Sequence, residues 1–88
     1  MGRLGVARMV SQEGLLEFLA DDLGIDTADL TSDSLLFSTG VIDSFALVSL
    51  MTYLEAEGGF RLSPTDVNLD NLDSIDRIVA FCRHKAAA

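Results

Sequence analysis

Apolar side chains recur at helical spacing in three stretches of this sequence. The first stretch, residues 10–23, has leucines on one face and acidic residues on the other, which predicts an amphipathic helix. Gly24 follows it and is a residue type that ends helices. The leucines are Leu15, Leu16, Leu19 and Leu23.

The second stretch predicts a helix from Ser44 to about Glu57, with Asp43 or Ser44 as its N-cap and Gly58-Gly59 at its end. Four apolar residues fall at the i, i+3, i+4, i+7 positions that face a core. They are Leu47, Leu50, Met51 and Leu54.

The third stretch predicts a helix from Ser74 to about Lys85, with Asp73 as its N-cap. Ahead of it, Ser63-Pro64 predicts a short helix through about Asn68, because proline suits the first helical position. The core face of the last helix is Ile75, Ile78, Val79 and Cys82.

Residues 25–43 lack a helical period. They are rich in Asp, Ser, Thr and Gly, which form turns and caps, and their apolar residues are irregularly spaced. We expect a long loop whose apolar side chains pack onto the helices, with room for a helical turn near residues 33–37. No stretch alternates like a β-strand. The predicted fold class is therefore all-α: a four-helix bundle of three main helices and one short helix, with a long first loop.

The chain has 88 residues, of which 49% are hydrophobic, enough for one domain and too few for two. We expect that domain over residues 10–85, a loose N-terminal extension over residues 1–9 and a tail over residues 86–88. No apolar run approaches the ~20 residues that span a bilayer, and the N-terminus lacks the features of a signal peptide. The expectation is a cytoplasmic monomer without a membrane span.

Fourteen acidic residues against six basic ones give a formal charge of −8. All fourteen acids lie between Glu13 and Asp76, where Arg61 is the only base, so this segment carries −13. Such charge argues against nucleic acid as a partner and favours basic protein surfaces. A solvated surface of helices and loops explains the same charges equally well.

A catalytic or metal site is hard to build from these residues. His84 lies near the C-terminus and Cys82 on a core face, so neither is expected to be catalytic, and we do not expect an enzyme. Asp66, Asn68 and Asp70 stand at the first, third and fifth places of a calcium loop, but an arginine holds its twelfth place, which defeats the site. No metal is therefore expected, and a calcium-responsive module is the weakest alternative.

Ser44 is the remaining candidate, because it opens the second helix directly after the long loop. A phosphodiester there would meet free backbone N–H groups and the positive end of the helix. On these grounds alone, a serine in this place is more often a plain N-cap.

The segment from Phe37 to Phe45, FSTGVIDSF, resembles the attachment region of acyl carrier proteins. In that family an Asp-Ser-Leu motif opens the second helix and is usually preceded by a glycine. The order of the predicted helices is also similar over about residues 10–85. The strings GVIDSF and DNLDSI look most like specialised stand-alone carriers, including D-alanyl and other aminoacyl carriers.

The resemblance implies that a phosphopantetheinyl transferase moves 4'-phosphopantetheine from coenzyme A to Ser44, with Asp43 as part of the motif. The thiol of that arm then holds an acyl or aminoacyl group as a thioester for enzymes of lipid, polyketide or aminoacyl-transfer biosynthesis, which load and transfer the group. The competing interpretation is an acidic helical interaction module without a prosthetic group.

The second helix departs from the family pattern. Phe45 replaces the usual leucine, and uncharged residues stand where fatty-acid carriers commonly have acids. We therefore expect partner recognition there to be more apolar. The expected partner-binding residues are Phe45, Val48, Glu55 and Glu57.

Overall fold

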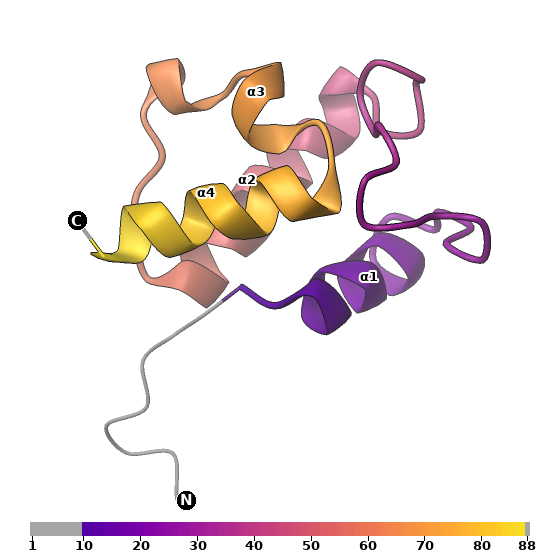
Figure 1. Cartoon of the computed structure of the whole chain (residues 1–88), viewed down its shortest axis with the longest axis horizontal. Helices are drawn as coiled ribbons and strands as arrows, with labels where there is room; N and C mark the ends of the chain where they lie inside the picture. The colour runs from indigo at the N-terminus through magenta and orange to yellow at the C-terminus, as the bar shows by residue number, and fades with distance from the viewer. Residues whose placement is uncertain (1–9, 88) are drawn as a thin grey trace, which may run out of the picture.

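The structure is a computed structural model that describes residues 10–87. Its helices are α1 (Gln12–Asp21), α2 (Ser44–Gly58), the 3₁₀ helix η1 (Pro64–Asp66), α3 (Leu69–Leu72) and α4 (Ile75–Ala87). In Figure 1, α4 lies in front of α2, and the long connection from α1 to α2 lies on the right. Residues 10–87 contain no strand, which confirms the predicted all-α bundle with a long first loop.

Side-chain and glycine caps set the ends of the first two helices. The Ser11 hydroxyl accepts the N–H of Gly14 at 3.0 Å, so α1 begins one residue later. It ends at Asp21, before the predicted Leu23, and the chain turns at Gly24 with φ 67°. Helix α2 ends as predicted, because Gly59 adopts φ 70° and donates its N–H to the Glu55 carbonyl.

The predicted short helix over residues 64–68 is shorter than expected, because only Pro64–Asp66 is helical. The helical conformation is lost at Val67, where ψ is 88°, and Asn68 is extended. The Asn68 side-chain oxygen then accepts the N–H of Asn71 at 2.9 Å and caps a separate turn, α3, which the sequence analysis missed.

The predicted N-cap of the last helix is wrong. The Ser74 hydroxyl accepts the N–H of Arg77 at 3.1 Å and caps α4. Asp73 instead ends α3, and its carboxylate points toward the long loop. Helix α4 also continues to Ala87, two residues beyond its predicted end.

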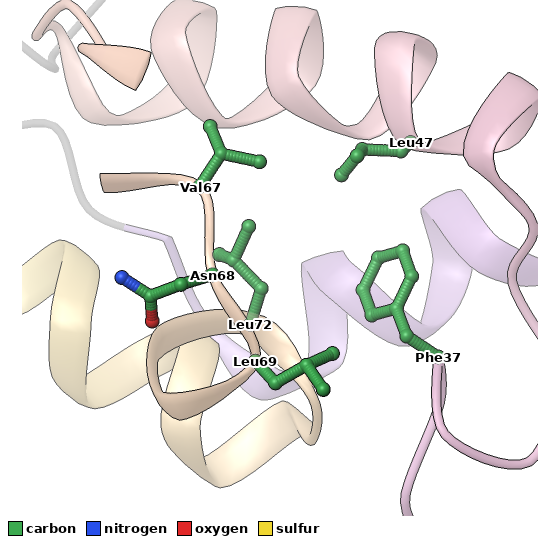
Figure 2. Close-up of a pocket in the computed structure, with 6 residues that line it drawn as sticks. All are labelled: Phe37, Leu47, Val67, Asn68, Leu69 and Leu72. Carbon is green, nitrogen blue, oxygen red and sulfur yellow. The ribbon is translucent and has the colours of Figure 1, made fainter. Parts of the chain in front are cut away.

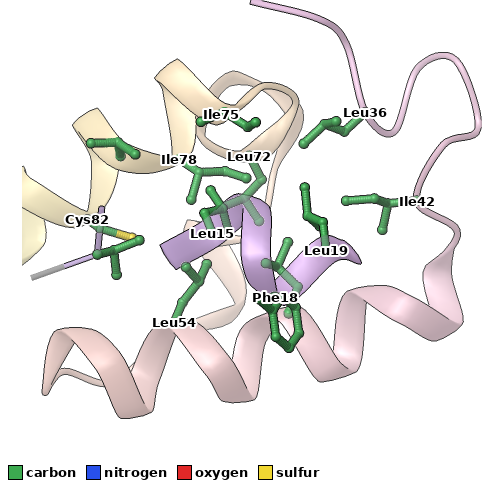
Figure 3. Packing of buried hydrophobic residues seen from close by; sticks show 13 residues of the cluster. Leu15, Phe18, Leu19, Leu36, Ile42, Leu54, Leu72, Ile75, Ile78 and Cys82 are labelled. Atoms are coloured by element: carbon green, nitrogen blue, oxygen red, sulfur yellow. The ribbon is translucent and has the colours of Figure 1, made fainter. Parts of the chain in front are cut away.

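One hydrophobic core joins the helices to the loop. Figure 3 shows Leu36 and Ile42, both from the loop, at one end of this core and Cys82 at the other. Leu36 is 0% and Ile42 2% exposed, so the expectation that the loop packs onto the helices is confirmed. The buried hydrophobic residues are Val10, Leu15, Phe18, Leu19, Leu36, Ile42, Leu50, Leu54, Leu72, Ile75, Ile78, Val79 and Cys82.

Two details of the predicted packing differ. Residues 33–37 form turns and bends, without a helix. On α2, Leu50 and Leu54 are buried as predicted, but Leu47 and Met51 are only partly buried. None of the helices within residues 10–87 has the length and apolar character needed to cross a membrane. The predicted extension over residues 1–9 lies outside the described part.

The burial of the loop predicts unequal effects at two neighbouring leucines. Leu36→Ala should lower the free energy of unfolding by about 2–5 kcal/mol, since it leaves a cavity in the core. Leu35→Ala, at a side chain that is 40% exposed, should change it by less than about 0.5 kcal/mol. Urea denaturation followed by circular dichroism measures both. Equal, small effects would show that the loop does not belong to the core.

A second prediction concerns Asp66, whose carboxylate pairs with the Lys85 ammonium at 2.7 Å. The hydrogen bonds from Lys85 and from the N–H of Ser63 lower the pKa of Asp66 from 3.8 to about 2. Because the folded pKa lies below the unfolded one, this stabilisation is present above pH 3.8 and is lost as the pH falls toward about 2.

Lys85→Met should therefore raise the pKa of Asp66 toward 3.8, as measured by NMR titration of its carboxyl carbon. The difference in unfolding free energy between wild type and variant should shrink across the same acidic range. Arg83→Met is the matched control, because it also removes a cation from α4. Arg83 is exposed and forms no ion pair within residues 10–87. An unchanged Asp66 titration in Lys85→Met would contradict the pairing.

Candidate functional site

Ser44 is the first residue of α2 and is exposed to solvent. Asp43 precedes it as the N-cap: its carboxylate accepts the N–H of Ala46 at 2.8 Å, and its carbonyl accepts the N–H of Leu47 at 3.0 Å. No residue of the described part hydrogen-bonds the Ser44 hydroxyl. The cap is therefore supplied by Asp43, which leaves the serine oxygen available to an enzyme.

The start of α2 suits a phosphate group. The N–H groups of Ser44 and Phe45 make no hydrogen bond within residues 10–87, and the first turn of α2 contains no acidic residue. Unpaired N–H groups and the positive end of the helix dipole favour an anion at this position. A phosphodiester on the Ser44 oxygen would thus lie beside two unpaired N–H donors, which fit a phosphate, and beside the Asp43 carboxylate, which adds a negative charge.

A tight turn leads the chain into this position. The Gly40 N–H donates to the Phe37 carbonyl at 3.1 Å, and the Ile42 N–H donates to the Leu36 carbonyl at 2.9 Å. Gly40 has φ 82°, a conformation that side chains disfavour, so glycine is needed here for its backbone freedom. Buried Ile42 then fixes the chain two residues before Ser44.

The other side of this turn is held by Asp73, which is only 2% exposed. Its Oδ1 accepts the N–H groups of Leu36, Phe37 and Ser38 at 3.2, 2.7 and 3.0 Å, and its Oδ2 accepts the Ser38 hydroxyl. The Ser38 hydroxyl, aided by the three N–H groups, lowers the pKa of Asp73. The carboxylate therefore stays ionised at neutral pH although no basic side chain within residues 10–87 pairs with it.

A cavity of about 190 Å³ opens between α2 and α3, beside Leu47 and so one helical turn from Ser44 (Figure 2). Its only polar lining residue is Asn68, whose amide oxygen accepts from Asn71 and whose amide nitrogen donates to the Thr65 carbonyl. The other five lining side chains are apolar, so the wall is mostly apolar. The lining residues are Phe37, Leu47, Val67, Asn68, Leu69 and Leu72.

The four expected partner-binding residues do not share one environment. Phe45 and Val48 are 85% and 64% exposed and lie close to Ser44 in sequence, on the outer side of α2. Glu57 is exposed at the far end of that helix. Glu55 is half-buried, and its carboxylate accepts the N–H of Leu62 at 2.8 Å. This hydrogen bond ties the connection after α2 to the helix.

The remaining chemical candidates are placed away from this site. Cys82 is buried in α4, and burial raises the pKa of its thiol to about 11, so the thiolate is disfavoured. His84 is exposed on the last turns of α4. No group of three or more His, Cys, Asp or Glu side chains within residues 10–87 could hold a metal ion.

Sequence reasoning predicted Ser44 and Asp43 as site residues, and it missed two features that lie next to them in the fold. The role of Asp73 was hidden because its partners are 35–37 residues away along the chain, and an Asp before a helix looks like a cap. The cavity was hidden because α3 was not predicted. The Asn68-to-Asn71 spacing was the signal that could have revealed α3.

Comparisons with known proteins identify a family and several relatives. The family model described as "Phosphopantetheine attachment site" matches residues 13–82. The chain is 32% identical to the D-alanyl carrier protein of Abiotrophia defectiva over 72 residues, which cover 82% of this chain and 80% of that protein. It is 30% identical to the D-alanyl carrier protein of Lacticaseibacillus casei (strain BL23) over 69 residues, covering 78% and 85%.

No solved structure matches the chain at a comparable level of significance. The family model spans most of the chain, including the loop, the start of α2 and the core of α4. The chain therefore belongs to the family of carrier proteins that bear a covalently attached phosphopantetheine.

Proposed function

We propose that Ser44 carries the 4'-phosphopantetheine and that the chain presents an aminoacyl group, held as a thioester on that arm, to other enzymes. The observation that carries this proposal is the exposed Ser44 hydroxyl at the first position of α2, with Asp43 already supplying the cap. The related D-alanyl carrier proteins support an amino acid, with D-alanine as the first candidate, over a long fatty acyl chain.

The residues of the chain take part in the attachment as acceptor and support. The Ser44 oxygen forms the new bond to phosphorus and loses its proton, while the nucleotide part of coenzyme A leaves. Within residues 10–87 no side chain accepts a hydrogen bond from the Ser44 hydroxyl, and the Asp43 carboxylate is engaged with Ala46, so we assign the base and the catalysis to the transferase. The chain itself catalyses nothing under this proposal. When bound, the group supplies a terminal thiol that forms the thioester with the cargo.

The cavity beside Leu47 is better suited to contact apolar parts of the arm than to hold the aminoacyl cargo. An aminoacyl thioester carries an ammonium group, and burial of an unpaired charge is costly. Apart from Asn68 the side chains that line the cavity are apolar, so the cavity offers that ammonium no carboxylate to pair with. The aminoacyl end is therefore expected to remain in solvent, where a partner enzyme can reach it.

The outer side of α2 is the proposed contact for these enzymes. Phe45 and Val48 present apolar surface next to Ser44, and residues 44–54 carry no charge. Glu57 remains available at the rim, whereas Glu55 is already engaged with Leu62. Apolar contact close to the arm contributes affinity. Long-range attraction from the acidic chain raises the association rate.

The attachment is tested by intact mass after incubation with coenzyme A, magnesium and a broad-specificity phosphopantetheinyl transferase. Wild type should gain one phosphopantetheine, and Ser44→Ala should gain none. Ser49→Ala, at an exposed serine on the same helix, is the matched control and should gain one. No gain by wild type with several transferases would favour the acidic interaction module without a prosthetic group.

The contact surface is tested by the kinetics of the same transfer. Phe45→Ala should raise the KM for the carrier about fivefold to tenfold, which corresponds to about 1–1.4 kcal/mol of lost contact. Its unfolding free energy should stay unchanged, because the ring is 85% exposed. Leu35→Ala, at another exposed apolar side chain, is the control and should leave KM unchanged. Equal KM values for wild type and Phe45→Ala would exclude this residue from the contact.

A further inference from the structure

The carboxylate of Asp73 is a buried charge whose partners all come from the loop before Ser44. Three consecutive backbone N–H groups and one hydroxyl converge on it, from Leu36, Phe37 and Ser38. Hydrogen bonds to an ionised acceptor are stronger than neutral ones, and release of the loop would lose all four of them. These hydrogen bonds therefore couple the loop to the α3–α4 junction in addition to the packing of Leu36.

The same junction holds the loop at two further points. The Leu36 N–H also donates to the Asp73 carbonyl at 2.7 Å, and the Asp76 N–H in the first turn of α4 donates to the Ser32 carbonyl at 2.9 Å. The loop segment 32–38 thus lies along the start of α4 and is tied to it by both backbone and side chain. Within residues 10–87, no other side chain accepts from three consecutive N–H groups.

Only a few residues separate the Asp73 contact from Ser44, and most of them are fixed by hydrogen bonds or burial. Leu36, held by Asp73, accepts the N–H of Ile42, and Ile42 is buried two residues before Ser44. Phe37, also held by Asp73, forms one wall of the cavity beside Leu47. Movement of the Asp73–loop contact would therefore displace both the start of α2 and the wall of the cavity.

We infer that Asp73 is a positioning residue for Ser44, which keeps the start of α2 in the one arrangement that the transferase binds. This inference rests on the proposed function of Ser44. Asp73 does not touch the reacting atoms, so its loss should change how often the competent arrangement is present. A smaller competent fraction raises the apparent dissociation constant by the inverse of that fraction and leaves the chemistry within the complex unchanged.

The test measures kcat and KM for phosphopantetheine transfer to Asp73→Asn. Asparagine keeps the size of the side chain but replaces one acceptor oxygen by a donor and removes the charge. KM for the carrier should rise about fivefold to tenfold while kcat stays within about twofold. Ser38→Ala removes only the hydroxyl, so a smaller rise in KM is expected, and Ser38→Thr, which keeps the hydroxyl, should restore the wild-type value.

Cys82→Ala separates positioning from general stability. Cys82 is buried at the opposite end of the core from Leu36 and Ile42 (Figure 3), so its truncation destabilises the fold without touching the loop. KM for Cys82→Ala should equal that of wild type. The inference is overturned if folded Ser38→Ala and Asp73→Asn keep the wild-type KM, or if Cys82→Ala raises KM as much as they do.

These outcomes differ from failure of the proposed function. If wild type takes no group from coenzyme A, both proposals fall. If Ser44 is modified and the KM is the same for wild type and all variants, the proposed function stands. Only the positioning role of Asp73 is then lost.

Discussion

The buried carboxylate of Asp73 is the contact on which the geometry around Ser44 depends. A connection as long as residues 22–43, with no regular structure of its own, loses much conformational entropy when it is ordered. Two buried apolar anchors, Leu36 and Ile42, offset part of that cost. The hydrogen bonds to Asp73 orient the loop backbone, because they fix three consecutive N–H groups to one carboxylate at the α3–α4 junction.

This constraint explains how a small protein presents one serine reliably. The helix start needs a fixed approach, a cap and an uncovered hydroxyl, and each is supplied by a different residue. The loop gives the approach, Asp43 gives the cap, and Ser44 is left free of both tasks. The charged residues are also unevenly distributed. Residues 44–54 are uncharged, while the exposed face of α1 carries acids. The uncharged start of α2 and the acidic face of α1 thus belong to different helices.

Local signals in the sequence predicted the local structure. The apolar periods, the caps at Asp43 and Ser63, and the stop at Gly59 gave the main helices and the place of Ser44 within about two residues. The errors came from interactions that are distant along the chain or too short to show a period. Asp73 binds residues 35–37 positions away, which no local pattern reveals. Helix α3 is a single turn, and Met51 is less buried than its position on the helix suggested.

Amide hydrogen exchange at the loop tests the central claim most directly. If Asp73 holds the loop, the N–H groups of Phe37 and Ser38 should exchange slowly although they lie outside any helix. The N–H groups of Asp29 and Thr39, which make no hydrogen bond within residues 10–87, should exchange fast and serve as internal references. Exchange at Phe37 and Ser38 as fast as at Asp29 and Thr39 would contradict the account.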